Sequence, residues 1–334
     1  MEAEKNFEYF WLAMKKAVLA IDIGGTNTKI GIVSNEEFIG EVISIPSDGG
    51  NDLDQYTNAL LDAANKVKYS NHNAIDGIGI GVAGFVDESH SRMIFNPNIG
   101  WLENFPLADF FGNAFNQPVF VEVDSNAAAL AEAMHGNGQD SHRLLVLTVG
   151  TGLGGGMIID GEILRISNQC LGDIGHVIVE PGGLKCASGC GGCAEAYVSS
   201  QALEDQARKL AIQNPSSELG TQVMKNDHIT AREVITLAKR GEQYATAAIE
   251  VLGHYLGLAI SSMAPIFMPD TICIAGGISE AGSILIEATN KSFHQHVGLD
   301  YGKEVEIKKA NFGWQAVLIG AASAFKKSQT TNTK

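Results

Sequence analysis

The chain has 334 residues, of which 45% are hydrophobic and 18% charged, so composition indicates a soluble globular protein with length for two ordinary domains. Its formal net charge of −15 argues against nucleic acid as a main partner, because phosphate neutralisation needs clustered Lys and Arg. That charge does not exclude nucleotides, which glycine loops hold through N–H groups and a bridging Mg²⁺. Five cysteines, three of them between Cys186 and Cys193, do not resemble a disulfide scaffold and indicate a reducing cytoplasm.

Residues 1–16 are interpreted as an extension ahead of the fold. The apolar patch at 7–14 is short, and Glu2 and Glu4 precede it where a secretory signal carries positive charge. No apolar run in the chain reaches the roughly 18–20 residues needed to span a bilayer.

The first half alternates strands with helices. An apolar strand over 18–23 leads into the reversal Asp22-Ile-Gly-Gly-Thr-Asn-Thr-Lys29, and a second strand follows over 29–33. Periodicity then predicts a helix over 52–69, buried strands over 77–82 and 119–123, and an Ala-rich helix over 126–135. This alternation predicts an α/β architecture.

The first reversal recurs one domain's length later as Gly150-Thr-Gly-Leu-Gly-Gly-Gly156. An offset of 126 residues places Asp22 on Thr148 and the turn pair Ser34-Asn35 on Asp160-Gly161. Each copy has the pattern of a strand, a glycine-rich reversal, a second strand and a tight hairpin. The repeat predicts two related domains that face a shared cleft, where two loops of N–H groups would clamp an anion.

The second half is more helical. Helices are expected over 195–212, 230–239 and 243–267, and the strand at 271–275 breaks into a turn at Gly276-Gly277. A closing helix over 313–326 is expected to return to the first domain. The predicted division is 17–125 plus 313–328 for the N-terminal domain and 126–312 for the C-terminal domain.

The glycines of the first reversal suit a phosphate site. Gly24 and Gly25 let the backbone approach a phosphate without a Cβ in the way, while Thr26 and Asn27 add side-chain hydrogen bonds. Asp22 is suited to orient hydrated Mg²⁺. The alternative is a glycine hairpin that merely bends a sheet edge. The spacing fits neither the Gly-x-x-x-x-Gly-Lys-Ser/Thr loop nor the Gly-x-Gly-x-x-Gly dinucleotide motif.

Asp124 stands where a parallel strand ends and a helix begins, and such strand ends line ligand crevices in open α/β sheets. A carboxylate there can accept a hydroxyl proton during phosphate transfer. An Asp before a helix is also a routine N-cap, and position alone favours the cap.

A His-x₉-Cys-x₃-Cys-x₂-Cys run lies in a glycine-rich segment, formed by His176, Cys186, Cys190 and Cys193. Three thiolates and an imidazole supply the closed tetrahedron that structural Zn²⁺ prefers. The alternative is a set of unliganded loop cysteines.

Together these motifs resemble the ROK family (repressors, open reading frames and sugar kinases) from residue 18 to 325. The resemblance rests on both glycine reversals, Gly84, Pro97-Asn98, Asp124, Gly175-His176 and the cysteine cluster followed by Glu195. It implies a duplicated actin-like, ribonuclease-H-like fold, two ATPase domains flanking a central cleft, and phosphorylation of a hexose by Mg-ATP. It also suggests a homodimer.

The resemblance assigns roles to particular positions. Asp124 matches the catalytic base. The implied sugar contacts are Gly84, Asn98, Asp124, Asp173, His176 and Glu195. The implied ATP contacts are Asp22, Gly24, Gly25, Thr26, Asn27, Gly150, Thr151, Gly152, Gly276 and Gly277. His176 is also the zinc-ligand position, so the metal would stiffen the sugar-binding loop.

Three positions depart from the family pattern. Val123 replaces an Asn before the base, and Asp173 replaces a Glu three residues before His176. Ser188 takes the place of the second zinc cysteine, so Cys190 is expected to reach the metal instead.

The function implied is phosphorylation of glucose at its 6-hydroxyl. Alternatives are a fructose, mannose or N-acetyl amino sugar kinase, a non-catalytic binding protein, and a sugar-sensing repressor. The repressor is disfavoured because only 21 residues, not basic, precede Asp22, whereas repressor members carry a helix-turn-helix there.

Overall fold

The computed structural model describes residues 17–35, 37–47, 52–70, 74–95, 99–167, 169–298 and 300–331. The chain forms two compact units. The first unit comprises Met1–Ala127 and Val317–Lys334, and the second comprises Ala128–Ala316.

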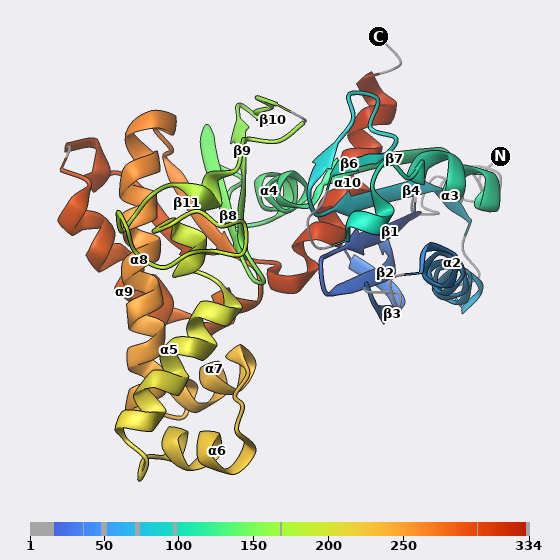
Figure 1. Ribbon diagram of the computed structural model, residues 1–334. Coiled ribbons are helices and arrows are strands. Elements are labelled where there is room, and N and C mark those ends of the chain that lie inside the picture. The colour runs from blue at the N-terminus through green and yellow to red at the C-terminus, as the bar shows by residue number, and fades with distance from the viewer. Residues whose placement is uncertain are drawn as a thin grey trace, which may run out of the picture. The chain divides into compact units, whose positions relative to one another are not determined.

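The first unit is built on a five-stranded sheet of order β3-β2-β1-β4-β7 (Figure 1). Its strands are β1 (Ala17–Ile23), β2 (Asn27–Ser34), β3 (Glu37–Pro46), β4 (Ile75–Val82) and β7 (Val119–Val123). The first three are antiparallel, while β4 and β7 run parallel to β1. Every residue of β1 is buried, as expected for a strand covered on both faces.

Helices and a hairpin complete this unit. They are α2 (Leu53–Ser70), α3 (Leu107–Phe115), the start of α4 (Asp124–His135), α10 (Ala316–Thr331), the short η2 (Gly100–Leu102), and the hairpin of β5 (Phe85–Val86) with β6 (Met93–Phe95).

The second unit repeats the same sheet, with order β10-β9-β8-β11-β12. Its strands are β8 (Arg143–Val149), β9 (Leu153–Ile159), β10 (Glu162–Ile163), β11 (Thr271–Ala275) and β12 (Glu306–Lys309). Again the first hairpin is antiparallel and the last two strands are parallel to the central one. The predicted duplicated α/β fold is therefore confirmed.

The helices of the second unit are more numerous than the sequence pattern predicts. They are α5 (Ser200–Gln213), α6 (Glu218–Asn226), α7 (Ala231–Lys239), α8 (Gln243–Phe267) and α9 (Ser283–His296), with the short helices η3 (Ile174–His176), η4 (Ala194–Ala196), η5 (Gly277–Ala281), η6 (Asp300–Lys303) and η7 (Gly313–Gln315).

The strand registers refine the repeat. Asp22 lies opposite Lys29 across the first reversal, whereas Thr148 lies opposite Gly154 across the second, which is one residue shorter. The offset between the copies therefore falls from 126 to 125 after the reversal. The expected match of Ser34-Asn35 with Asp160-Gly161 is wrong by one position, because Asn35 and Asp160 both adopt φ 48° at the next turn.

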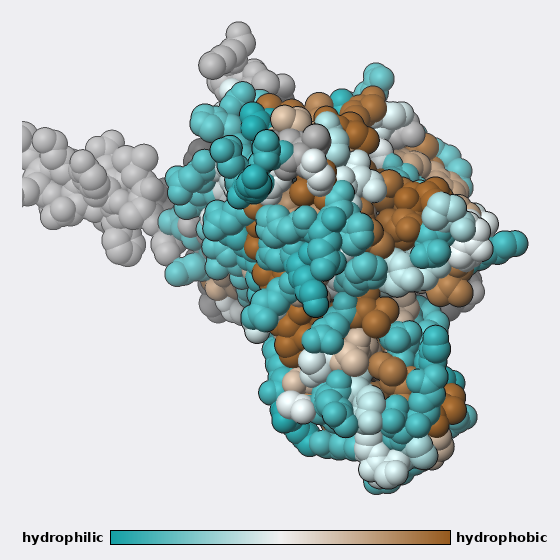
Figure 2. All heavy atoms as spheres, turned by 90° about the vertical axis from the view of Figure 1, so that its left-hand side faces the viewer, coloured by the Kyte–Doolittle hydropathy of each residue, from teal (hydrophilic) through white to brown (hydrophobic). Residues whose placement is uncertain are grey.

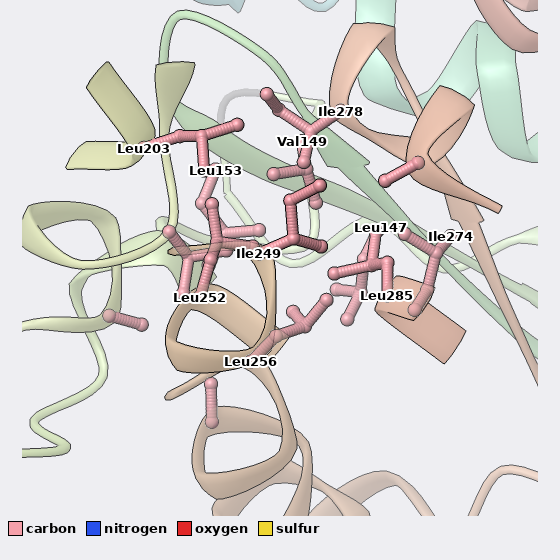
Figure 3. Packing of buried hydrophobic residues seen from close by; sticks show 14 of the residues in the cluster. Leu147, Val149, Leu153, Leu203, Ile249, Leu252, Leu256, Ile274, Ile278 and Leu285 are labelled. Carbon is pink, nitrogen blue, oxygen red and sulfur yellow. The ribbon is translucent and has the colours of Figure 1, made fainter. Parts of the chain in front are cut away.

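The core of the second unit lies between its sheet and α8 (Figure 3). Leu147 on β8 and Ile274 on β11 face Ile249 and Leu256 on α8, and all four are fully buried. This packing fixes α8 against the strands that end at the second glycine reversal.

Helix α8 is long and apolar enough to cross a membrane by length and composition, although the chain has no uninterrupted apolar run of that length. Of its most apolar window, 56% is buried in the protein, and its exposed positions include Glu250 and His254. The side of the molecule that carries α8 and α9 is largely hydrophilic (Figure 2). Helix α8 thus packs as a core helix, and its exposed positions are mixed, with Val251 and Ile266 beside the polar residues.

Glycines let α10 approach the first sheet and α4 closely. A Cβ at Gly79 on β4 would overlap the carbonyl of Ala321, and a Cβ at Gly320 would overlap the carbonyl of Ala127. The closing helix therefore packs on the first unit.

The crossing of α10 and α4 gives a test of this packing. Within a helix, Gly→Ala normally stabilises by about 1 kcal/mol through helix propensity. Gly320→Ala should instead lower the free energy of unfolding by roughly 1–3 kcal/mol, because the two backbones must separate to admit the methyl group. Urea unfolding measures this, with Gly100→Ala as the control because a Cβ there would lie in open space. A Gly320→Ala protein as stable as wild type would contradict the close crossing.

Candidate active site

The first glycine reversal is a closed turn with an acidic residue at its base. The Gly24 N–H donates to the Asn27 carbonyl over 3.2 Å, and Thr26 and Asn27 are exposed. Gly25, which precedes them, is half-buried. The turn thus presents polar groups at the end of β1, where phosphate contacts are expected from the sequence.

Asp22 is paired with a lysine to which the sequence motifs assign no role. Asp22 is only 5% exposed, and its Oδ2 accepts a hydrogen bond from Lys29 Nζ over 2.8 Å. Burial raises the pKa of Asp22, and the charge of Lys29 opposes that rise. The antiparallel register of β1 and β2 creates the pair, and only that register could have revealed it from the sequence.

Asp124 is the first residue of α4, directly after β7. Its Oδ1 accepts the backbone N–H of Ser125 over 2.6 Å. Burial raises the pKa of Asp124 to about 7, and the negative charge of Asp22 adds to the rise, while the Ser125 N–H and Lys29 act against it. A carboxylate that titrates near neutrality suits a general base, because it both holds and releases a proton at working pH.

Buried hydrogen bonds hold the junction of β7 with α4, where Asp124 lies. The carboxylate of Glu122, fully buried on β7, accepts the Val123 N–H over 2.9 Å and the Asn126 side-chain amide over 3.0 Å. These bonds fix the junction of β7 with α4 on both sides of Asp124.

The raised pKa of Asp124 makes stability depend on pH. On unfolding, the group returns to an ordinary value near 3.8, so the folded protein binds the proton more tightly and loses stability as pH rises from about 4 to about 7. Asp124→Asn removes this loss. The unfolding free energy of the variant minus that of wild type should therefore rise by about 1–3 kcal/mol when the pH is raised from 4 to 8. Urea unfolding at both pH values checks this, and a difference that stays constant with pH would contradict it.

Two further predicted sugar contacts belong to the first unit. Gly84 follows β4 with φ 104°, a conformation that favours glycine, and the preceding Ala83 N–H donates to the Ile23 carbonyl over 3.0 Å. Gly84 therefore lies next to the end of β1. Asn98 lies outside the described residues.

The second glycine reversal is bonded to the segment after the cysteine cluster. The Gly150 N–H donates to the Gly152 carbonyl over 3.0 Å, and the Gly150 carbonyl accepts the Ser200 N–H over 2.7 Å. Glu195 Oε2 accepts the Leu153 N–H over 3.1 Å, so a Cβ at Gly152 would collide with that carboxylate. Gly152 and Leu153 of the reversal therefore pack against the Glu195 carboxylate.

The Gly276-Gly277 turn lies beside the same reversal. Gly276 adopts φ 85° after β11, and a Cβ there would overlap the carbonyl of Val149 at the end of β8. Gly277 then begins η5, and apart from its chain neighbours no atom lies within 4 Å of where its Cβ would be. Gly276 and the second reversal are thus adjacent, as their predicted common role requires.

The four predicted metal ligands form one cluster. Cys190 Sγ lies 3.1 Å from Cys186 Sγ and 3.3 Å from His176 Nδ1, while Cys186 Sγ lies 3.8 Å from the same nitrogen. With Cys193, all four ligand atoms lie within 4.8 Å of one another. Tetrahedral Zn²⁺ with bonds of about 2.0–2.3 Å needs ligand atoms at roughly this spacing, so the donor set fits structural Zn²⁺.

Asp173 faces the other side of the imidazole. Its Oδ2 lies 3.4 Å from His176 Nε2, while Nδ1 points at the thiols. A carboxylate in that position commonly orients a metal-bound histidine. Between them, Gly175 packs so closely on β9 that a Cβ would overlap the Leu153 carbonyl. The cluster, Asp173 and the second glycine reversal are therefore neighbours within the second unit.

Known proteins resemble this chain along nearly its whole length. The ROK family matches residues 18–328. A glucokinase of Halalkalibacterium halodurans is 30% identical over 320 residues, which is 95% of this chain and 97% of that protein. A xylose repressor of Caldicellulosiruptor bescii is also 30% identical, over 91% of this chain and 76% of its own length. A ROK family glucokinase from Streptomyces griseus, solved in complex with glucose and AMPPNP, superposes with a TM-score of 0.83 at 30% identity, covering 92% of this chain and 98% of that one. The chain belongs to the ROK family.

Proposed function

We propose that this protein is an ATP-dependent glucokinase that converts glucose to glucose 6-phosphate. The observation that carries the proposal is Asp124, a carboxylate with a pKa of about 7 that follows a parallel strand, in a chain similar to a glucokinase over 95% of its length. The similarity of the Streptomyces griseus structure, which holds glucose and an ATP analogue, supports both substrates.

In the proposed reaction, Asp124 accepts the proton of the glucose 6-hydroxyl as that oxygen forms its bond to the γ-phosphorus of ATP. The bond from the γ-phosphorus to the bridging oxygen breaks, and ADP leaves. Such transfer is loose and rich in charge, so orientation and electrostatics supply most of the rate. Asp22 would orient the hydrating water molecules of Mg²⁺, and that ion would neutralise phosphate charge when bound with ATP.

The two glycine reversals and the Gly276-Gly277 turn provide the ATP contacts in this proposal. Each reversal has a backbone that approaches a ligand without side chains, which suits phosphate oxygens. In the second unit, Asp173, His176 and Glu195 provide sugar contacts. Glu195 also accepts the Leu153 N–H of the second reversal, so one carboxylate links the proposed sugar contacts to the proposed nucleotide contacts of this unit.

The cluster of His176 with three cysteines is proposed to hold a structural Zn²⁺. The metal would cross-link the loop that carries His176 and Asp173, and it takes no part in the phosphoryl transfer. This proposal is supported by the donor set and its spacing.

Another hexose remains the alternative substrate within the family. Val123 replaces an amide beside Asp124, and Asp173 is one methylene shorter than a Glu, so the usual pattern of hydroxyl contacts is altered. A sugar panel in a coupled ADP assay decides between them: glucose should give the highest kcat/KM, and a preference for fructose, mannose or an N-acetyl amino sugar would replace it.

A sugar-responsive regulator is the alternative of another class, since xylose repressors are among the relatives. A regulator needs no base with a pKa near neutrality, so Asp124 favours the kinase. Sugar-dependent release of ADP by the purified chain would support the kinase, and binding of sugar without ADP release would support the regulator. A cytoplasmic homodimer is proposed on the family likeness, and light scattering after size-exclusion chromatography tests the dimer.

A further inference from the structure

Lys29 lies beside the acidic groups of the first unit and has no assigned role in the proposed reaction. Because β1 and β2 place it opposite Asp22, its Nζ reaches Asp22 Oδ2 at 2.8 Å. The Asp22 side chain is 8% exposed and that of Lys29 is 29% exposed. Little water screens this pair, so its charges act over a longer range than surface charges do.

Asp22 and Asp124 approach each other across β4. Asp22 lies in register with Gly81, and a Cβ at Gly81 would lie 3.8 Å from the Cα of Asp124. Gly81 has no side chain, so at this position β4 places only backbone between Asp22 and Asp124. Burial is the main cause of the raised pKa of Asp124; the charge of Asp22 adds to it, and Lys29 lowers it.

We propose that Lys29 is a positioning residue whose ammonium group neutralises Asp22 and thereby keeps Asp124 available as an ionised base. The inference rests on the proposed kinase reaction, in which Asp124 must accept a proton. Without Lys29, the two carboxylates would share a largely buried site with no cationic side chain beside them, and one of them would take up a proton. A protonated Asp124 cannot act as the base.

The other groups around the two acids do not replace this charge. Tyr56, from α2, shares a hydrogen bond of 2.6 Å with Thr28; burial raises the pKa of Tyr56 to about 12, so it stays neutral in the working range. Glu122 is acidic and is held by Asn126 and the Val123 N–H.

Residues 316–325 of α10, which overlie β4, contain no titratable side chain. Among the described residues of this unit, Lys29 is the cation whose charge acts on Asp124.

The first test compares Lys29→Met with Lys29→Arg through the pH dependence of kcat/KM for glucose at fixed, saturating Mg-ATP. In Lys29→Met, the acidic limb should move upward by about one pH unit, so that kcat/KM is about fivefold lower at pH 7 and recovers towards pH 9. Lys29→Arg keeps the charge and should leave the limb near its wild-type position. A loss in Lys29→Met that is equal at every pH would overturn the proposal, because it would show a purely structural role.

A double variant separates charge from shape. In Asp22→Asn combined with Lys29→Met, both charges that act on Asp124 are absent, so the acidic limb should return to the wild-type position or below it, whatever rate is lost. A limb that stays raised in the double variant would contradict the neutralising role of Lys29.

A second readout needs no catalysis. The difference in unfolding free energy between a protein and its Asp124→Asn counterpart changes with pH up to the pKa of folded Asp124, and then becomes constant. That endpoint should lie about one pH unit higher in the Lys29→Met background than in wild type, and equal endpoints would overturn the proposal. If the wild-type chain phosphorylates no sugar, the kinase proposal fails, while this measurement still decides the role of Lys29.

Discussion

Replacing Asp124 by Asn should lower kcat by about a hundredfold or more, with little change in glucose affinity, because the amide keeps the shape of the carboxylate but accepts no proton. The wild-type enzyme should gain activity as pH rises through about 7, the pKa of Asp124, since the ionised form is the proposed base. The variant should lose this rise. Steady-state kinetics between about pH 5.5 and 9, read with a coupled ADP assay, measures both effects.

The matched control is Asp76→Asn, an exposed Asp at the opposite end of β4. It removes one carboxylate from the same unit without touching Asp124 or its neighbours, and should turn over like wild type. Near-normal turnover of Asp124→Asn would remove this residue from the role of base and leave only a structural one.

The junction that carries Asp124 was predictable because its signals are local. The run 119–123 consists of β-branched and aromatic residues apart from Glu122 and follows Pro118, and the Ala-rich segment after it has strong helix propensity, so strand and helix meet where expected. Helix α7 was similarly clear: it begins after Thr230, whose capping box with Glu233 is a sequence-level start signal.

Helix α3 and strand β3 are among the elements that the sequence pattern does not predict, each for a physical reason. Helix α3 has nine residues, too few for a marked periodicity, and it is fixed by burial of Phe111 and Phe115. Strand β3 shows no fully buried residue; its pairing with β2 defines it, and pairing is not written in the local sequence.

Most features of the site that local motifs could not predict are contacts between residues that the fold, not the local sequence, brings together. The bond from Leu153 to Glu195 joins residues 42 positions apart, so no motif spacing predicts it. The pair of Lys29 with Asp22 depends on a strand register that one residue more or less in the reversal would change. The second reversal has one residue fewer, which shows how little sequence information sets that register.

Cys190 provides the sharpest test of the metal proposal, because the family pattern has a cysteine where this chain has Ser188. Cys190 Sγ lies within 3.3 Å of both Cys186 Sγ and His176 Nδ1, so it is close to two of the other three predicted ligands. Purified wild-type protein should contain close to one equivalent of zinc per chain. Cys190→Ser should bind it at least about tenfold more weakly and lose it on dialysis against a chelator, because a hydroxyl is a poor substitute for a thiolate.

Loss of the metal should also lower the thermal midpoint and raise the KM for glucose, because the loop with His176 and Asp173 would lose its cross-link. Elemental analysis and thermal unfolding measure these changes without relying on activity. Ser188→Ala, in the same loop, and Cys170→Ser, a thiol outside the cluster, should both keep the metal. Metal-free wild-type protein with full stability, or a Cys190→Ser protein that retains a full equivalent against the chelator, would show that these thiols are not a zinc site.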